Sequence, residues 1–204
     1  MLKMQVMGKR PYRQTRRAEA TEATRQRILA AARDQLVSGE EFTIEAVATR
    51  AGVSRVTVYA QFGSREALRE AVFDYLAATG GLDAIPSIFV EPDPIEGIGR
   101  LIDIFCGFYA THRLVLRRLT ALAALAAGGE QQPPDRNPRR RQILTVLLSR
   151  AVQLPEYCGL DVEPAVGVLQ ALTSFEFYDR LVDEVTETDL ARYIRLLASA
   201  VLRG

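Results

Sequence analysis

Four side chains between Ser54 and Phe62 carry groups suited to contacting a nucleic acid. They are Arg55, Thr57, Tyr59 and Gln61. An arginine can direct two donors onto a guanine, a threonine can bond a base or a phosphate, and tyrosine and glutamine can donate to phosphate oxygens. The segment therefore predicts recognition of a polyanionic duplex.

Two short helices joined by a tight turn must position these side chains. Thr43 is a natural N-cap, and the apolar residues that follow it share one inward face: Ile44, Val47, Ala48 and Ala51. Gly52 can adopt the positive φ that ends the first helix, and Ser54 can cap the second helix at once. This order predicts a helix-turn-helix, whose second helix enters a DNA major groove. A purely structural corner between two packed helices is the alternative interpretation.

Flanking segments complete an N-terminal domain that we expect over residues 21–77. A first helix is predicted from about Thr21 to Val37, and a later helix capped by Ser64 carries the apolar stripe Leu68, Val72 and Leu76. Residues 1–20 are expected to form a basic flexible arm, because Lys9–Arg17 holds five cations in nine residues. The arm is either a solvated tail or a segment that binds phosphates or enters the minor groove.

Charge is distributed unevenly along the 204 residues. Residues 1–70 contain 13 Lys and Arg against 8 Asp and Glu, a balance of +5, whereas residues 71–204 contain 13 against 17, a balance of −4. The basic first third fits a polyanionic partner, although a solvated tail would give the same balance.

Residues 24–76 resemble the N-terminal DNA-binding domain of TetR-family transcriptional regulators. The resemblance rests on separately spaced elements that agree in register: Arg27–Ala32, Thr43, Ala51–Ser54, Thr57–Tyr59, Phe62 and Ser64–Leu68. Two departures stand out. Ala60 and Gln61 occupy positions where the family often has a second aromatic residue and a histidine, and Arg65 replaces the family's lysine while keeping its charge.

The motif and the resemblance together imply a set of DNA-contacting residues. This set is Thr43, Ser54, Arg55, Val56, Thr57, Tyr59, Gln61 and Arg65. We expect Arg55 to read a base, and phosphate contacts from Thr43, Thr57, Tyr59, Gln61 and Arg65.

The remaining residues, 78–204, are expected to form an all-helical domain, which gives an all-α protein of about nine helices. Helical periodicity predicts segments at about 93–110, 112–127, 137–154, 162–182 and 188–202. The last segment carries an apolar stripe that suits either a core or an interface. The resemblance implies that the last two helices dimerise, through Phe177, Leu190, Tyr193, Ile194, Leu197 and Val201.

The resemblance also implies a small-molecule effector bound in the C-terminal domain. Mainly apolar and aromatic residues are expected to line its site: Phe105, Tyr109, His112, Leu116, Phe175 and Tyr178. The same side chains would equally serve a core, and His112 would equally serve as a surface or capping residue. Glu176, Asp179 and Asp183 are expected on one helix face, as a cation or polar-ligand site or as a solvated stripe. The Arg139–Arg141 run is expected to be a solvated first turn rather than a second DNA contact.

The expected function is therefore a homodimeric TetR-like regulator, an effector-released repressor of a palindromic operator. The alternatives are a DNA-binding dimer without an effector and an all-α enzyme with a structural helix-turn-helix corner. We expect no enzyme, metal or cofactor, because the sequence lacks Gly-x-Ser-x-Gly, Gly-x-x-x-x-Gly-Lys and Gly-x-Gly-x-x-Gly motifs and has one histidine. No apolar run reaches 18 residues and no secretory leader is evident, so a cytoplasmic location with reduced Cys106 and Cys158 is expected.

Overall fold

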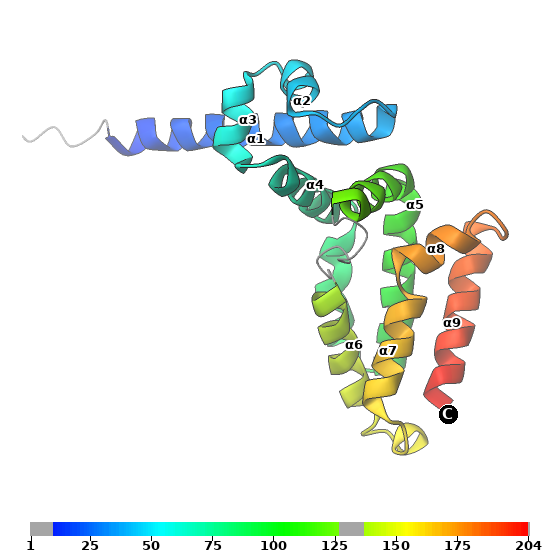
Figure 1. Cartoon of the computed structure of the whole chain (residues 1–204). Coiled ribbons are helices and arrows are strands. Elements are labelled where there is room, and N and C mark those ends of the chain that lie inside the picture. Colours follow the sequence, from blue (N-terminus) through cyan, green and yellow to red (C-terminus); the bar gives the residue numbers. More distant parts are fainter. Residues whose placement is uncertain (1–9, 127–136, 204) are drawn as a thin grey trace, which may run out of the picture. The chain divides into compact units, whose positions relative to one another are not determined.

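The computed structural model describes residues 10–126 and 137–203, and every regular element in these ranges is helical (Figure 1). The expected all-α class is thereby confirmed. The elements are α1 Arg10–Ser38, α2 Ile44–Ala51, α3 Arg55–Phe62, α4 Arg65–Thr79, η1 Leu82–Val90, α5 Pro94–Ala126, α6 Asn137–Ala151, η2 Pro155–Tyr157, α7 Val162–Leu172, α8 Phe175–Leu181 and α9 Glu187–Arg203. The chain divides into two compact units, Met1–Tyr75 and Leu76–Gly204.

The core of the N-terminal unit follows the apolar periodicity of its helices. Helix α1 packs against α2, and α2 against α3. Ile28, Ala32 and Leu36 are buried along one face of α1, and Val47 of α2 and Val58 of α3 are also fully buried. Helix α3 therefore packs on the core through the face that carries Val58, and its opposite face stays exposed.

Helix α1 begins at Arg10, within the segment that was expected to be a flexible arm. Pro11 stands in the first turn, where the missing N–H has no intrahelical partner in any case. Helix-favouring alanines at positions 18, 20 and 23 continue the helix to the buried part. Residues 10–20 are therefore helical, and residues 1–9 of the expected arm lie outside the described residues.

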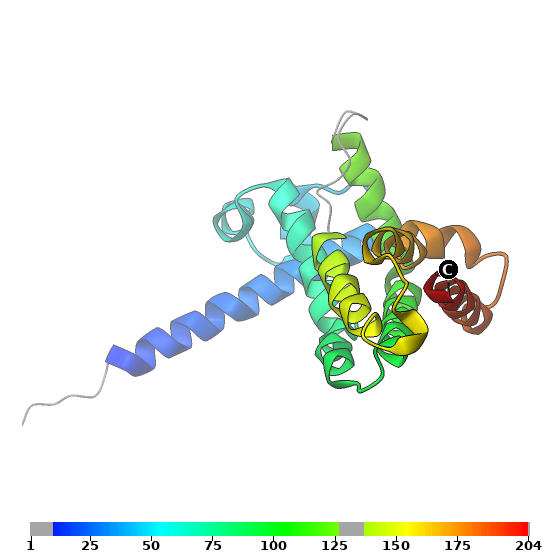
Figure 2. The same ribbon diagram turned by 90° about the horizontal axis from the view of Figure 1, so that it is seen from below.

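Helix α5 is central to the C-terminal unit. It packs against η1, α6, α8 and α9, while α7 lies between α6 and α9 (Figures 1 and 2). The side chains in the middle of this bundle include Leu101, Phe108, Leu147 and Val166, all at most 1% exposed. No helix of the described residues is long and apolar enough to cross a membrane.

Two helix boundaries of this unit differ from the sequence-based expectation. Residues 93–110 and 112–127 were expected as two helices, but α5 is continuous because Thr111 stays helical and its hydroxyl donates to the Gly107 carbonyl (2.9 Å). Residues 162–182 were expected as one helix, but the chain breaks after Leu172. Ser174 causes the break, since its side chain accepts from the Phe177 N–H (3.1 Å) and caps α8.

Candidate functional site

A left-handed glycine sets the turn between α2 and α3. Gly52 has φ 64°, and the N–H of Val53 donates back to the Ala48 carbonyl (3.0 Å). A Cβ added to Gly52 would meet no atom within 4 Å, so backbone conformation rather than space requires glycine there. The sequence-based expectation for this turn is thus met in detail.

Hydroxyl caps fix the start of each helix around this turn. The Thr43 hydroxyl accepts from the Ala46 N–H (3.1 Å), and the Ser54 hydroxyl accepts from the Thr57 N–H (3.1 Å). The hydroxyls of Ser54 and Thr57 also share a hydrogen bond of 2.9 Å. Three predicted DNA-contacting residues therefore hold the helix ends in place in the free protein, an arrangement that orients α3.

The outer face of α3 presents four exposed side chains: Arg55, Val56, Tyr59 and Ala60. Val56 is 77% exposed and Tyr59 is 45% exposed, although both are large apolar or aromatic residues. Thr57 and Gln61 are half-buried at the edges of this face. An exposed arginine, a flat aromatic residue and a β-branched apolar residue thus share one face of a short helix.

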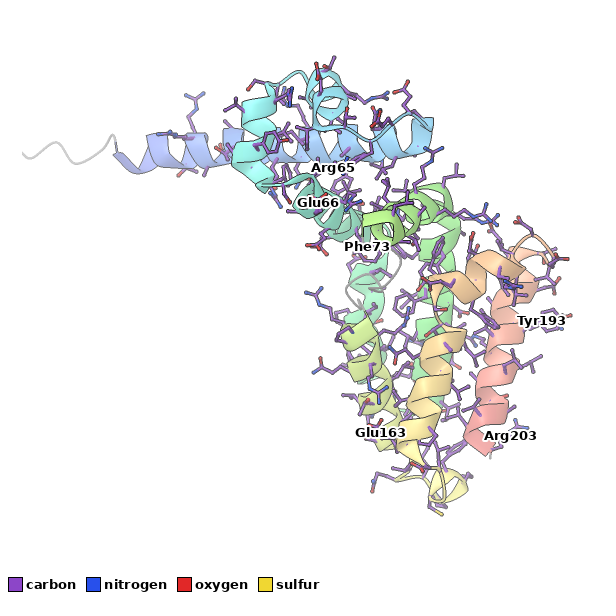
Figure 3. All side chains as sticks on the ribbon, in the orientation of Figure 1. Arg65, Glu66, Phe73, Glu163, Tyr193 and Arg203 are labelled. Atoms are coloured by element: carbon purple, nitrogen blue, oxygen red, sulfur yellow. The ribbon has the colours of Figure 1, made fainter. Side chains whose placement is uncertain are left out.

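Arg55 lies beside an acidic residue of the preceding helix. Its guanidinium Nη1 is 3.6 Å from Oε2 of Glu45, and both side chains are more than half exposed. An exposed pair of this kind is worth about 1 kcal/mol or less, so Arg55 can exchange its carboxylate partner for another acceptor. Arg65, also exposed, lies at the start of α4, next to Glu66 (3.5 Å; Figure 3).

Arg25 is a contributor to this surface that the sequence did not reveal. Its Nη1 donates to the Gln61 carbonyl (3.3 Å), and its guanidinium lies 4.5 Å from the centre of the Phe62 ring. Helix α1 is thereby attached to the C-terminal end of α3. The two partners are 36 residues apart, and no local pattern links them.

Four of the six predicted effector residues form one aromatic cluster in the C-terminal unit. The ring of Tyr109 lies 5.8 Å from that of Phe105 and 5.5 Å from those of Phe175 and Tyr178. His112 lies 5.1 Å from the ring of Phe108, which itself contacts Tyr109. Leu116 is buried one turn further along α5.

Two polar partners of this cluster were missed by sequence reasoning. The hydroxyl of Tyr109 donates to the Thr173 carbonyl (3.0 Å), and Nη1 of Arg140 donates both to that hydroxyl (3.1 Å) and to that carbonyl (3.1 Å). Arg140 is half-buried, so the expected solvated turn is wrong at this position, whereas Arg139 and Arg141 are exposed as expected. Arg141 pairs at the surface with Glu163 of α7, and Arg140 points toward α5 and the end of α7 because α6 packs against both helices.

Burial changes the acidity of three groups in and near the cluster. It raises the pKa of Tyr109 to about 12, a shift that the nearby Arg140 partly offsets. It also raises the pKa of Tyr178 to about 12 and that of the Cys106 thiol to about 12. All three are neutral donors at physiological pH, and among the described residues the buried Tyr178 hydroxyl has no hydrogen-bond partner.

The predicted acidic face is occupied by arginines of α5. Arg113 donates to Asp179 (2.7 Å) and to Asp183 (2.5 Å), and Arg117 donates to Asp179 (2.7 Å). Hydrogen bonds from Arg113 lower the pKa of Asp183. Asp179 of α8 and Asp183, which follows α8, are therefore one side of an ionic contact with α5, whereas Glu176, the third residue of the predicted face, is exposed.

The predicted dimer residues divide into three groups, two residues in each. Leu190 and Ile194 are 1% and 2% exposed, so they belong to the core of the monomer. Tyr193 and Leu197 are 45% and 46% exposed, and Figure 3 shows Tyr193 on the outer side of α9. Phe177 and Val201 are half-buried.

One hollow in the C-terminal unit lies apart from the predicted effector residues. It has a volume of about 150 Å³ and opens between the start of α5 and α9. Its lining includes Ile98, Ile102, Arg195 and Ala198, and none of the six predicted residues. Within the described ranges, no group of three or more His, Cys, Asp or Glu side chains could hold a metal ion.

The sequence of the N-terminal unit matches a known family. Residues 28–72 match the family described as bacterial regulatory proteins, tetR family. The resemblance that the sequence suggested is thereby confirmed over this segment, which contains α2 and α3 and parts of α1 and α4. No curated protein matches the chain.

Solved structures of regulators share the fold across both units. A TetR-like transcriptional regulator from Rhodococcus sp. RHA1 aligns with a TM-score of 0.64 at 23% identity, over 89% of this chain and 96% of that chain. NalD, a secondary repressor of the MexAB-OprM multidrug efflux pump in Pseudomonas aeruginosa, aligns with a TM-score of 0.61 at 18% identity, over 90% and 97%. A gamma-butyrolactone receptor (ArpA-like protein) aligns with a TM-score of 0.53 at 23% identity, over 90% and 98%.

Proposed function

We propose, from the match of residues 28–72 to tetR-family regulatory proteins, that this protein is a DNA-binding transcriptional regulator whose α3 reads the major groove. The observation that carries the proposal is the exposed face of α3, on a helix whose start is fixed by the Gly52 turn and the Ser54 cap. This is the placement that a recognition helix requires.

Each side chain of that face has a distinct role in the proposal. Arg55 forks onto a guanine, and Val56 packs against a thymine methyl group. Tyr59 donates to a phosphate oxygen, and Arg65 binds a phosphate at the start of α4. Thr43, Ser54 and Thr57 orient the helices, with their hydroxyls available at the edge of the contact. Gln61 adds a phosphate contact at the end of α3.

The active species in this proposal is a homodimer formed by α7 and α9. On α9 the apolar residues Tyr193, Leu196 and Leu197 are between 45% and 56% exposed. On α7 four exposed residues are small or apolar, Pro164, Gly167, Val168 and Ala171, and the exposed Glu163 at its start pairs with Arg141. A Cβ on Gly167 would meet nothing within 4 Å, so a helix of a second copy can approach closely there. Because α7 and α9 pack on each other, the two copies would form a four-helix contact.

Leu197→Glu tests this dimer. It places a charge in the centre of the proposed contact, at a side chain that the monomer leaves 46% exposed. We expect monomers in sedimentation with an unchanged helical spectrum. Leu114→Glu, at a position on α5 that is 60% exposed, is the matched control and should leave the dimer intact. Monomers from both variants, or from neither, would contradict the proposed interface.

Regulation by a small-molecule effector is the second part of the proposal. The aromatic cluster around Tyr109 supplies apolar walls, and the Tyr178 hydroxyl, Tyr109 hydroxyl and Arg140 guanidinium supply donors. An effector with hydrogen-bond acceptors on an apolar body suits these groups. Repression released by such an effector is supported by two of the fold neighbours, one a repressor and the other a gamma-butyrolactone receptor. The effector acts by favouring a dimer whose two α3 helices no longer match the groove spacing.

Fluorescence anisotropy with the DNA that flanks the protein's own gene tests the DNA-binding function. We expect tight binding to this DNA that weakens steeply with salt, and only weak binding to an unrelated duplex. Tyr59→Phe should weaken binding and leave the dimer unchanged. Equal, weak binding to both duplexes could mean that the operator lies elsewhere, so duplexes are then selected from random sequences. If no preferred duplex emerges, the helix-turn-helix is only a structural corner.

A further inference from the structure

Three buried hydroxyl groups lie where α5, α8 and the end of α7 meet. The Tyr109 hydroxyl donates to the Thr173 carbonyl (3.0 Å), and the Thr173 hydroxyl donates to the Leu169 carbonyl (2.7 Å). The Tyr178 hydroxyl has no hydrogen-bond partner among the described residues, although the residue is only 1% exposed. Of these three hydroxyl groups, that of Tyr178 therefore carries a proton for which the described chain supplies no acceptor.

A buried donor of this kind costs stability without improving the packing. Burial removes the hydroxyl from water, and no protein acceptor replaces the lost hydrogen bond. A phenylalanine at position 178 would fill the same space without that cost. Because buried polar groups in folded proteins are nearly always bonded, this exception indicates that Tyr178 serves an acceptor from outside the chain.

The charges near the Tyr178 hydroxyl disfavour an anionic ligand. Burial raises the pKa of this hydroxyl to about 12, and the carboxylates of Glu187 and Asp179 contribute to the rise, which Arg113 partly offsets. Arg113 is itself paired with Asp179 (2.7 Å). The balance of these charges is negative, so a ligand carboxylate would be repelled here and a neutral acceptor is favoured.

Two acceptors of the same cluster are already in use, which disfavours a ligand that brings its own donor. The Thr173 carbonyl accepts from the Tyr109 hydroxyl and from Nη1 of Arg140 (3.1 Å). The Tyr109 hydroxyl oxygen accepts from the same Nη1 (3.1 Å). A carbonyl oxygen accepts without donating, unlike an alcohol or a carboxylic acid. The rings of Phe105 and Phe175, 5.8 Å and 5.5 Å from that of Tyr109, offer an apolar surface to the rest of such a molecule.

We propose that the Tyr178 hydroxyl is the donor that recognises the effector, and that the effector is a neutral carbonyl compound, such as a ketone or an ester, on an apolar or aromatic body. The inference rests on the proposed function and narrows it from any molecule with acceptors to an uncharged one. It assigns the contact to Tyr178 because the proton of Tyr109 already bonds the Thr173 carbonyl.

Three small probes test the chemistry of the ligand on the full-length protein. Acetophenone carries a carbonyl group, ethylbenzene replaces that group with a methylene, and benzoate carries a charge. We expect NMR titrations to show binding of acetophenone and no binding of benzoate. The carbonyl stretching frequency of bound, isotope-labelled acetophenone should lie below its value in hexane, because a hydrogen bond weakens the carbonyl bond. No binding of acetophenone, or an unshifted frequency, would overturn the contact, and tighter binding of benzoate would overturn the neutral class.

Tyr178→Phe assigns the contact to one hydroxyl. We expect the affinity for acetophenone to fall about five-fold and the affinity for ethylbenzene to stay unchanged, since only the first probe has an acceptor. Tyr157→Phe, which removes the hydroxyl of a tyrosine in η2, is the matched control and should change neither affinity. An unchanged affinity for acetophenone in Tyr178→Phe, or equal losses for both probes, would overturn the assignment. These titrations contain no DNA, so a failure of specific operator binding would overturn the proposed function and leave this contact standing.

Discussion

The two units of the protein use polar side chains over very different sequence distances. In the N-terminal unit the caps Thr43, Ser54 and Ser64 each bond a backbone N–H three residues away, and the Arg55–Glu45 pair spans ten residues. In the C-terminal unit, the Tyr109–Thr173 bond spans 64 residues and the Arg113–Asp179 pair spans 66. The polar bonds around α2 and α3 are therefore mostly local, although the Arg25–Gln61 bond spans 36 residues, whereas the bonds named for the second unit join distant helices.

This comparison predicts that substitutions change DNA binding in the N-terminal unit and stability in the C-terminal unit. Arg55→Ala should give the largest effect, because a bidentate arginine contributes about 1 to 3 kcal/mol at one base pair in each half-site. We expect the loss of discrimination at a single operator position, with the free energy of unfolding unchanged. Anisotropy against a set of single-base variants measures it. Equal weakening on all sequences would make Arg55 a phosphate contact.

In the C-terminal unit the corresponding change affects stability instead. Tyr109→Phe removes the hydroxyl that bonds the Thr173 carbonyl and Arg140, and we expect the free energy of unfolding to fall by about 2 kcal/mol. Tyr178→Phe is the matched control, because that buried hydroxyl has no partner among the described residues, and it should change stability by less than about 0.5 kcal/mol. Urea unfolding followed by circular dichroism separates the two. Equal losses of unfolding free energy in the two variants would show that the hydrogen bonds of the Tyr109 hydroxyl do not stabilise the fold.

Alkaline pH should also affect the C-terminal unit selectively. Burial raises the pKa of Tyr109 and Tyr178 from about 10 to about 12. The folded state therefore retains these protons while the unfolded state loses them, so their contribution to stability is complete below pH 10 and is lost as pH rises to 12. Absorbance at 295 nm should show that Tyr109 and Tyr178 ionise late, together with unfolding. Ionisation of these two tyrosines near pH 10 with the fold retained would contradict the burial.

The smallest expected effect concerns the exposed pair of the N-terminal unit. Glu45→Gln removes a carboxylate 3.6 Å from Arg55, which in the proposed complex would compete with DNA for the guanidinium. We expect operator affinity to rise by a few-fold, mostly at low salt. Glu40→Gln, which breaks the similar Arg50 pair (3.5 Å), is the control. Equal gains from both variants would reflect net charge alone.

The same difference in sequence distance explains what the sequence could predict. The α2–α3 turn, its caps and the exposed face of α3 depend on residues within about ten positions of one another, and the periodicity and cap chemistry indicated them. The Arg140 bonds, the arginines that face Asp179 and the contact of Arg25 with α3 depend on packing between distant helices, which no local pattern encodes. Leu190 and Ile194 were assigned to an interface from the resemblance, because the stripe alone does not state which helix it packs against, and both are buried in the monomer.

The break between α7 and α8 is another feature that the sequence pattern did not indicate. The Thr173–Ser174 break was not predicted because the residues on both sides of it favour a helix, and the Ser174 cap decides the outcome. The break leaves the Thr173 carbonyl available for Tyr109 and Arg140. A single serine thus creates the acceptor around which the polar part of the aromatic cluster is arranged.

The continuity of α5 couples the helices that are attached to it. Its 33 residues form a rod about 50 Å long, and Asp103, Tyr109 and Arg113 follow one another along it at intervals of about one to two turns. Asp103 is tied to Arg195 of α9, Tyr109 to the end of α7, and Arg113 to α8. A rotation of α5 at Tyr109 would therefore move Asp103 and Arg113 with it, and so act on both α9 and α8, because one continuous helix carries all three residues.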